Sequence, residues 1–86
     1  MADVLTADEI AAHFSAMDDS VTLIAATVAD DSEALAMNGS AAEVKLMITR
    51  NTDHLELQAT HDWYSDSSVS KTAYTDAVTA GKAYVG

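Results

Sequence analysis

The chain is 86 residues long and carries 14 acidic side chains against four basic ones, for a formal net charge of −10. Nucleic acid and anionic lipid are bound through Lys and Arg, so this charge argues against direct contact with either. The chain contains no cysteine, which excludes disulfides, thiolate metal ligands and a cysteine nucleophile. No apolar run approaches the roughly 20 residues that span a bilayer, so we expect neither a transmembrane segment nor a signal peptide.

The acidic charge is concentrated in the first half of the chain. Residues 1–44 hold nine acidic side chains and no Lys or Arg, whereas residues 45–86 hold five acidic side chains and all four basic ones. A surface built from the first half would attract a basic partner and repel nucleic acid. The acidic face predicted there comprises Asp8, Asp18, Asp19, Asp30, Asp31 and Glu33. Adjacent acidic pairs fall at expected helix starts, where capping and the helix dipole favour negative charge, so a structural role is favoured over acid–base catalysis.

The first predicted helix begins at a capping box, TADE at residues 6–9, in which a Thr hydroxyl and a Glu carboxylate each bind a free backbone N–H. Ile10, Phe14 and Met17 follow at helical spacing. We expect a second helix to start at residues 18–20 (DDS) and to carry an apolar stripe ending at Val28.

Residues 30–33 (DDSE) either interrupt that second helix or cap a new short one over residues 33–37. Asn38-Gly39 is expected to end this segment, because glycine readily adopts the left-handed conformation that closes a helix.

A second capping box, SAAE at residues 40–43, opens the longest periodic segment. Its stripe at helical spacing is Val44, Met47, Ile48, Asn51, Leu55, Ala59 and Trp63. Residues 44–60 also fit a β-hairpin, because apolar and polar side chains alternate on both sides of residues 51–53. The strong capping box and the lack of glycine in the turn favour the helix.

The last predicted helix has Ser70 as its N-cap, after a polar loop at residues 65–68. Its stripe consists of Tyr74, Val78, Gly81 and Val85. The missing side chain of Gly81 would let a neighbouring helix approach closely.

These segments predict an all-α fold, a small bundle of four to five helices that forms a single domain over residues 1–86. An α+β fold with a hairpin at residues 44–60 is the alternative. The predicted core comprises Ile10, Phe14, Ile24, Val28, Leu35, Ile48, Leu55, Trp63 and Val78. A compact chain of this length has a radius of gyration of roughly 12 Å.

A helical bundle of this size buries only about three-fifths of its unfolded surface, so further burial against a partner would stabilise it. Aromatic side chains, and a glycine that allows close approach, suit such an interface. The predicted interaction residues are Trp63, Tyr64, Tyr74, Gly81 and Tyr84.

No motif in the chain carries recognisable chemistry. His54 and His61 are seven residues apart, too far for one helical turn to present both to one metal ion. His13 is paired with no nucleophile by any motif, and neither Ser15 nor Ser20 lies in a G-x-S-x-G turn. We therefore expect no catalytic residues, no cofactor and no metal site.

Three segments of the second half have a distinctive composition: RNTDHLE at residues 50–56, DW at residues 62–63 and AVTAGKAYV at residues 77–85. In these segments the chain resembles small helical proteins encoded among the structural genes of tailed bacteriophages. The resemblance implies a virion-associated or accessory phage protein, located in the virion or the host cytoplasm, and brings no catalytic motif with it.

The leading functional hypothesis is a non-enzymatic structural or adaptor protein that docks on a larger protein assembly or self-associates through helix faces. The alternative is an acidic DNA mimic, an inhibitor of the anti-restriction or anti-CRISPR type, in which the acidic face stands in for phosphates. Both hypotheses imply a protein partner and neither involves direct contact with nucleic acid or a membrane.

Overall fold

The computed structural model describes residues 5–86 and is built from helices. The helices are α1 (Ala7–Ala29), α2 (Ser32–Asn38), α3 (Ala41–Gln58), α4 (Asp62–Asp66) and α5 (Thr72–Val85). No strand occurs between residues 5 and 86, which confirms the all-α prediction. The hairpin alternative at residues 44–60 is wrong, because α3 stays helical through Gln58.

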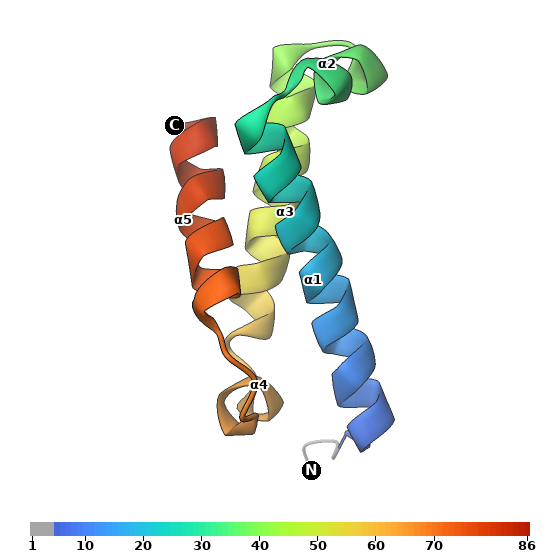
Figure 1. Ribbon diagram of the computed structural model, residues 1–86, viewed down its shortest axis with the longest axis vertical. Helices are drawn as coiled ribbons and strands as arrows, with labels where there is room; N and C mark the ends of the chain where they lie inside the picture. The colour runs from blue at the N-terminus through green and yellow to red at the C-terminus, as the bar shows by residue number, and fades with distance from the viewer. Residues whose placement is uncertain (1–4) are drawn as a thin grey trace.

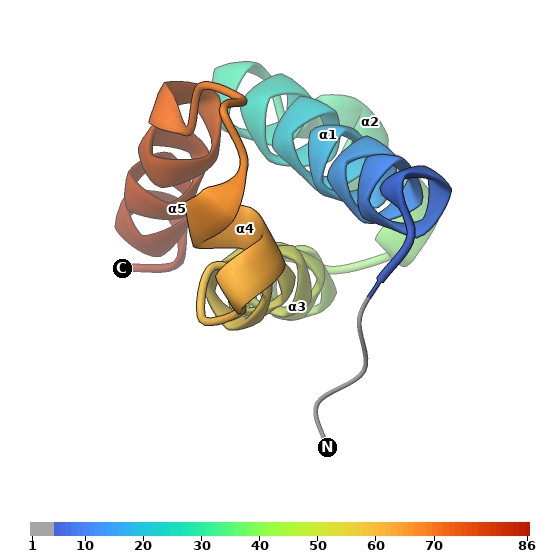
Figure 2. The ribbon, with the colours of Figure 1, turned by 90° about the horizontal axis from the view of Figure 1, so that it is seen from below.

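The three long helices α1, α3 and α5 lie alongside one another, with α2 across one end of the bundle and α4 at the other (Figure 1). Viewed from below, the three long helices occupy the corners of a triangle and α4 lies across the near end (Figure 2). The bundle measures 43 × 20 × 18 Å and has a radius of gyration of 14.1 Å. The expected value of about 12 Å assumed a more spherical shape. The expected radius of gyration is too small because the bundle is elongated: α1 alone has 23 residues and is therefore about 34 Å long at the rise of an α-helix.

α1 begins at the predicted capping box and then continues past the predicted second start. The Glu9 N–H donates to Thr6 Oγ1 at 3.1 Å, and the Thr6 N–H donates to Glu9 Oε1 at 2.9 Å. The prediction of a new helix at residues 18–20 is wrong, since α1 is continuous to Ala29. Ser20 does not cap a helix; its side chain is buried and bonds to α3.

The end of α2 and the start of α3 follow their predicted signals, whereas α2 begins at Ser32, one residue before the predicted start, and its N-cap Asp31 makes no side-chain capping hydrogen bond. Gly39 ends α2 with a φ of 88°, in the left-handed region. Ser40 then caps α3, because its hydroxyl accepts the Glu43 N–H at 3.2 Å. This is one half of the predicted capping box; the Glu43 side chain does not accept the Ser40 N–H in return.

The expected continuation of the α3 stripe to Trp63 is wrong. The N–H groups of Thr60 and His61 donate to carbonyls three residues back, which tightens the last turn, and the Thr60 hydroxyl donates to the Leu57 carbonyl at 2.7 Å. Trp63 therefore belongs to the short helix α4. The last helix also starts one residue later than predicted, with Lys71 as its N-cap.

The core runs along the axis between the three long helices. The largest fully buried side chains are Met17, Ile24, Val44, Ile48 and Leu55. Of the predicted core residues, the buried ones are Phe14, Ile24, Ile48 and Leu55, and the partly buried ones are Ile10, Leu35, Trp63 and Val78. Val28 is 41% exposed, so its place in the predicted core is wrong. The uninterrupted α1 buries Thr27 in its place.

α3 and α5 approach closely at Gly81. A Cβ atom added there would lie 2.3 Å from Thr52 Oγ1. Thr52 is buried, and its hydroxyl donates to the Ile48 carbonyl at 2.8 Å. The close approach predicted from Gly81 is thus present, and the approaching helix belongs to the same chain.

Candidate functional site

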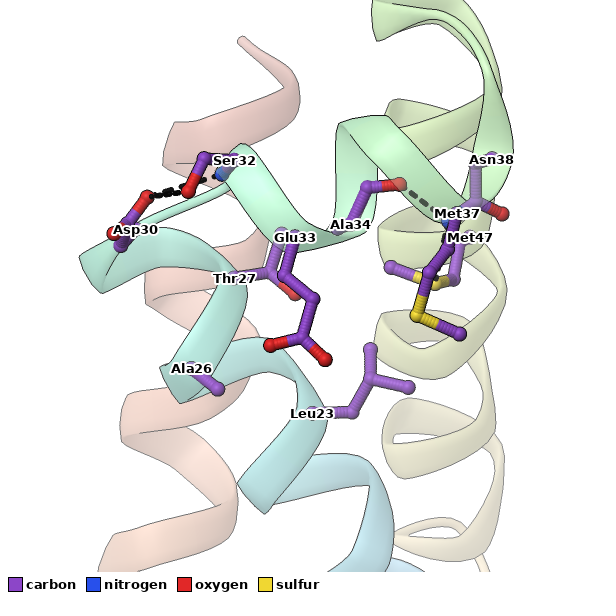
Figure 3. A pocket seen from close by; sticks show the side chains of 10 residues that line it. All are labelled: Leu23, Ala26, Thr27, Asp30, Ser32, Glu33, Ala34, Met37, Asn38 and Met47. Carbon is purple, nitrogen blue, oxygen red and sulfur yellow. Dashed lines mark hydrogen bonds between the residues drawn. The ribbon is translucent and has the colours of Figure 1, made fainter.

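A groove of about 480 Å³ lies where α2 crosses the end of α1 and the first half of α3 (Figure 3). Its size falls within the range of typical binding pockets, roughly 300–1,000 Å³. The apolar part of its lining consists of Leu23, Ala26, Ala34, Met37 and Met47. Three helices therefore contribute to one concave apolar surface.

Two methionines make this surface adaptable. Met37 is 79% exposed, more than any other large apolar side chain among residues 5–86. Asn38 braces the wall beside it, because its amide donates to the Ala34 carbonyl at 2.8 Å and contacts Met47 Sδ at 3.9 Å. Methionine side chains are unbranched and polarizable, so they adjust their shape to differently shaped partners.

The rim of the groove is acidic. Asp30 Oδ1 accepts the Ser32 N–H at 3.0 Å and the Ser32 hydroxyl at 2.7 Å. These two hydrogen bonds, with the backbone one dominant, lower the pKa of Asp30, so it is charged at neutral pH. The Glu33 side chain extends over the groove toward Leu23 and Ala26 (Figure 3). No Lys or Arg is among the lining residues.

The six residues of the predicted acidic face lie on α1, on α2 and in the link between them. Asp31 is partly buried and the other five are exposed: Asp8, Asp18, Asp19, Asp30 and Glu33. They follow the length of the bundle and do not form one dense cluster. The members at positions 8, 19 and 30 are spaced eleven residues apart, about 16 Å along a helix.

Two of these acids connect α1 and its C-terminal link to α5. The Tyr74 hydroxyl donates to Asp18 Oδ1 at 2.6 Å, and the Tyr84 hydroxyl donates to Asp31 Oδ2 at 2.9 Å. Burial, followed by the hydrogen bond to Asp18, raises the pKa of Tyr74 above its usual value. Desolvation and the Asp31 hydrogen bond raise the pKa of Tyr84 in the same way.

The five predicted interaction residues differ in their exposure. Tyr64, Tyr74 and Gly81 are buried within the chain, and Trp63 and Tyr84 are half-buried. The structure therefore places three of the five in contacts between the chain's own helices.

An aromatic cluster explains where these rings lie. Phe14 contacts Trp63 edge-on, with ring centroids 5.4 Å apart, and lies 6.0 Å from Tyr64 and 5.9 Å from Tyr74. His13 and His61 both stack on Trp63, at 4.9 and 5.8 Å. Sequence reasoning missed both stacking contacts: the one with His13 depends on how α4 lies against α1, and the one with His61 on the local turn that starts α4.

A polar cluster crosses the core between α1 and α3. The Asn51 amide donates to the Met47 carbonyl at 2.9 Å, which leaves Asn51 Oδ1 as the acceptor for the Ser20 hydroxyl at 2.9 Å. The Ser20 oxygen lies 3.0 Å from His54 Nδ1. Asn51 Oδ1 can only accept, so the Ser20 hydroxyl is the donor of that hydrogen bond, whereas the direction of the Ser20–His54 hydrogen bond depends on the imidazole tautomer. These hydrogen bonds join Ser20 on α1 to two side chains of α3, so the cluster links the two helices.

Among residues 5–86, no three His, Asp or Glu side chains are grouped so that they could hold a metal ion. None of the helices in that range combines the length and the apolar character needed to cross a membrane. No protein-family model, curated protein or solved structure matches the chain.

Proposed function

We propose that the chain is a non-enzymatic structural or adaptor protein that binds another protein through the α2 end of the bundle. The observation that carries this proposal is the apolar groove bordered by Met37, with the carboxylates of Asp30 and Glu33 at its rim. Single exposed apolar side chains are common on protein surfaces. Here the exposed side chain borders a concave apolar surface built by three helices, which is typical of a binding site.

The polar cluster in the core supports a non-enzymatic role. The serine closest to a histidine, Ser20, is 5% exposed and donates its proton to an amide oxygen. Because this side chain is buried and joins α1 to α3, its contacts are those of a helix-pairing residue.

Site-directed photocrosslinking tests the proposal. A benzophenone amino acid at position 37 is expected to yield one discrete adduct of higher mass in cells that produce the protein. The same amino acid at Asp53, which is exposed on α3 and outside the groove lining, is the matched control and should yield none. Equal labelling at both positions, or none at either, would contradict the proposal.

Light scattering on the purified chain then separates a second copy from a different protein as the partner. Measured at about 50 mM and about 500 mM salt, a salt-insensitive oligomer would indicate self-association through apolar helix faces. A monomer at both concentrations would assign the crosslinked adduct to another protein.

The acidic-inhibitor alternative draws support from the exposed carboxylates along α1 and α2, where residues 5–44 carry no Lys or Arg. It predicts inhibition of a DNA-binding nuclease that weakens steeply with salt. Replacing Asp8, Asp19 and Glu33 by their amides should abolish that inhibition while the helical circular dichroism stays unchanged. Inhibition that survives the replacement would exclude this function. A phage origin, with the virion or host cytoplasm as location, stays a prediction from the resemblance described above.

A further inference from the structure

We infer that the partner segment bound by the groove is a basic amphipathic helix, which inserts an apolar side chain against Met37 and Met47 while its Lys or Arg side chains pair with Asp30 and Glu33. This inference rests on the proposed protein-binding function and specifies the chemistry of the partner. It follows from the composition of the groove and from the ways in which proteins commonly recognise peptides.

Three other common recognition modes do not fit the groove. Addition of a strand needs an exposed sheet edge, and residues 5–86 form no strand. Proline-rich segments bind between aromatic side chains, and no aromatic residue lines this groove. Phosphorylated or acidic motifs need Arg clusters, and the lining contains no basic residue. A helix that places its apolar face into an apolar groove is the mode that fits.

Charge complementarity indicates that the bound helix is basic. Both ionisable side chains of the lining, Asp30 and Glu33, are acids. Asp30 already uses one oxygen to hold Ser32, and its other oxygen is available to a cation. The Glu33 carboxylate lies over the apolar floor (Figure 3), where a Lys or Arg next to an apolar anchor would meet it.

The same charges argue against a second copy of the chain as the occupant. Each chain carries a net charge of −10, and residues 5–44 contain no Lys or Arg to pair with the acids of another copy. Docking two α2 ends would bring acid against acid, which is unfavourable. A basic helix removes this repulsion.

A model peptide tests the inference directly. The probe is an amphipathic Leu/Lys peptide of about 18 residues, long enough to form a helix. One control has the same composition scrambled so that no apolar face forms, and the other has Glu in place of every Lys. With ¹³C-methyl-labelled methionine, the Met37 and Met47 signals should shift on binding of the Leu/Lys peptide, while the signal of the fully buried Met17 stays in place.

Two surface variants locate the contact. Met37→Ala should weaken binding about tenfold, as the loss of a central apolar anchor does. Leu57→Ala is the matched control, since Leu57 is 61% exposed but lies outside the groove, and its affinity should be unchanged. Glu33→Gln should weaken binding and flatten its salt dependence, whereas Asp53→Asn should do neither.

Each contrary result overturns a defined part of the inference. Equal binding of the scrambled peptide would exclude an amphipathic helix, and equal binding of the Glu peptide would exclude charge complementarity. Binding that leaves the Met37 and Met47 signals unmoved would place the contact elsewhere. No binding of the Leu/Lys peptide would reject a basic helical partner altogether. The crosslinking experiment at position 37 does not use the peptide, so it tests the broader protein-binding proposal separately from these four results.

Discussion

Ser20 shows how a single side chain can join two helices. Its hydroxyl donates to Asn51 and shares a hydrogen bond with His54, both on α3, while the Asn51 amide donates to the Met47 carbonyl. All the polar groups involved are satisfied only when α1 and α3 are correctly aligned. The cluster therefore fixes the register of these two helices more specifically than apolar packing alone.

Removing the Ser20 hydroxyl should destabilise the fold. Ser20→Ala leaves Asn51 Oδ1 and His54 Nδ1 without their partner, and we expect the free energy of unfolding to fall by about 1–3 kcal/mol. Urea denaturation measures the change. Ser15→Ala, at an exposed site on the same helix, is the control and should stay within about 0.5 kcal/mol of the parent. Equal stability of the two variants would show that the cluster contributes nothing.

At the scale of helix pairs, the contact of α5 with α3 depends on the absence of a side chain at Gly81. Gly81→Ala improves helix propensity by about 1 kcal/mol. The added methyl group, however, would lie 2.3 Å from the oxygen of a buried threonine whose rotamer is held by a hydrogen bond. Overpacking of this kind costs about 1–3 kcal/mol, so we expect net destabilisation of the parent protein.

The sign of this effect should change when the threonine is removed. In a Thr52→Ala background the nearest atoms to the new methyl group are Ile48 Cγ2 at 3.5 Å and the Cβ of residue 52 at 3.6 Å, which are ordinary contacts. Gly81→Ala should then be neutral or stabilising by up to about 1 kcal/mol. A double-mutant cycle by urea denaturation measures the coupling. Additive effects would refute the steric argument.

The elements that local signals specify were predictable from the sequence. The capping box at Thr6, the left-handed Gly39 and the cap at Ser40 each act within a few residues, and each is present. The predicted break at Ser20 failed because a long-range partner on α3 satisfies the polar side chain inside a continuous helix. The predicted end of α3 was wrong for a local reason: a tightened turn at Thr60 ends the helix before the apolar stripe ends.

The candidate site was less predictable than the fold. Its acidic residues were identified, but the apolar groove forms only where α2 turns across α1 and α3, and no local pattern specifies that crossing. The aromatic residues selected as interaction candidates include two buried tyrosines, because sequence periodicity identifies an apolar face and not what covers it. Met37 carried no periodic signal, since it does not pack in the core.

At the scale of the whole molecule, three tyrosines make stability sensitive to alkaline pH. The pKa of each of Tyr64, Tyr74 and Tyr84 is raised in the folded state, with desolvation as the first cause. A raised pKa means that the folded protein retains these protons more strongly than the unfolded chain. The resulting stability is fully present below the unfolded pKa of about 10 and is lost as the pH rises through the folded values.

We therefore expect the unfolding temperature to fall as the pH is raised above about 10. Tyr74→Phe should lower stability at neutral pH by about 1 kcal/mol, through loss of the hydrogen bond to Asp18, and should make the alkaline decline shallower. Thermal melts across this range, followed together with tyrosinate absorbance, measure both effects. An identical alkaline decline in the variant would show that Tyr74 is not among the groups responsible.

The positions of the first and last helix ends also determine where attachments can be placed. The start of α1 and the end of α5 lie at opposite ends of the bundle, which is 43 Å long (Figure 1). The hydrogen bond from Tyr84 to Asp31 places the end of α5 beside the link that leads into α2. A fusion partner, dye or surface linker joined ahead of α1 would therefore lie at the end of the bundle away from α2, whereas one joined after Gly86 would lie near the α2 end.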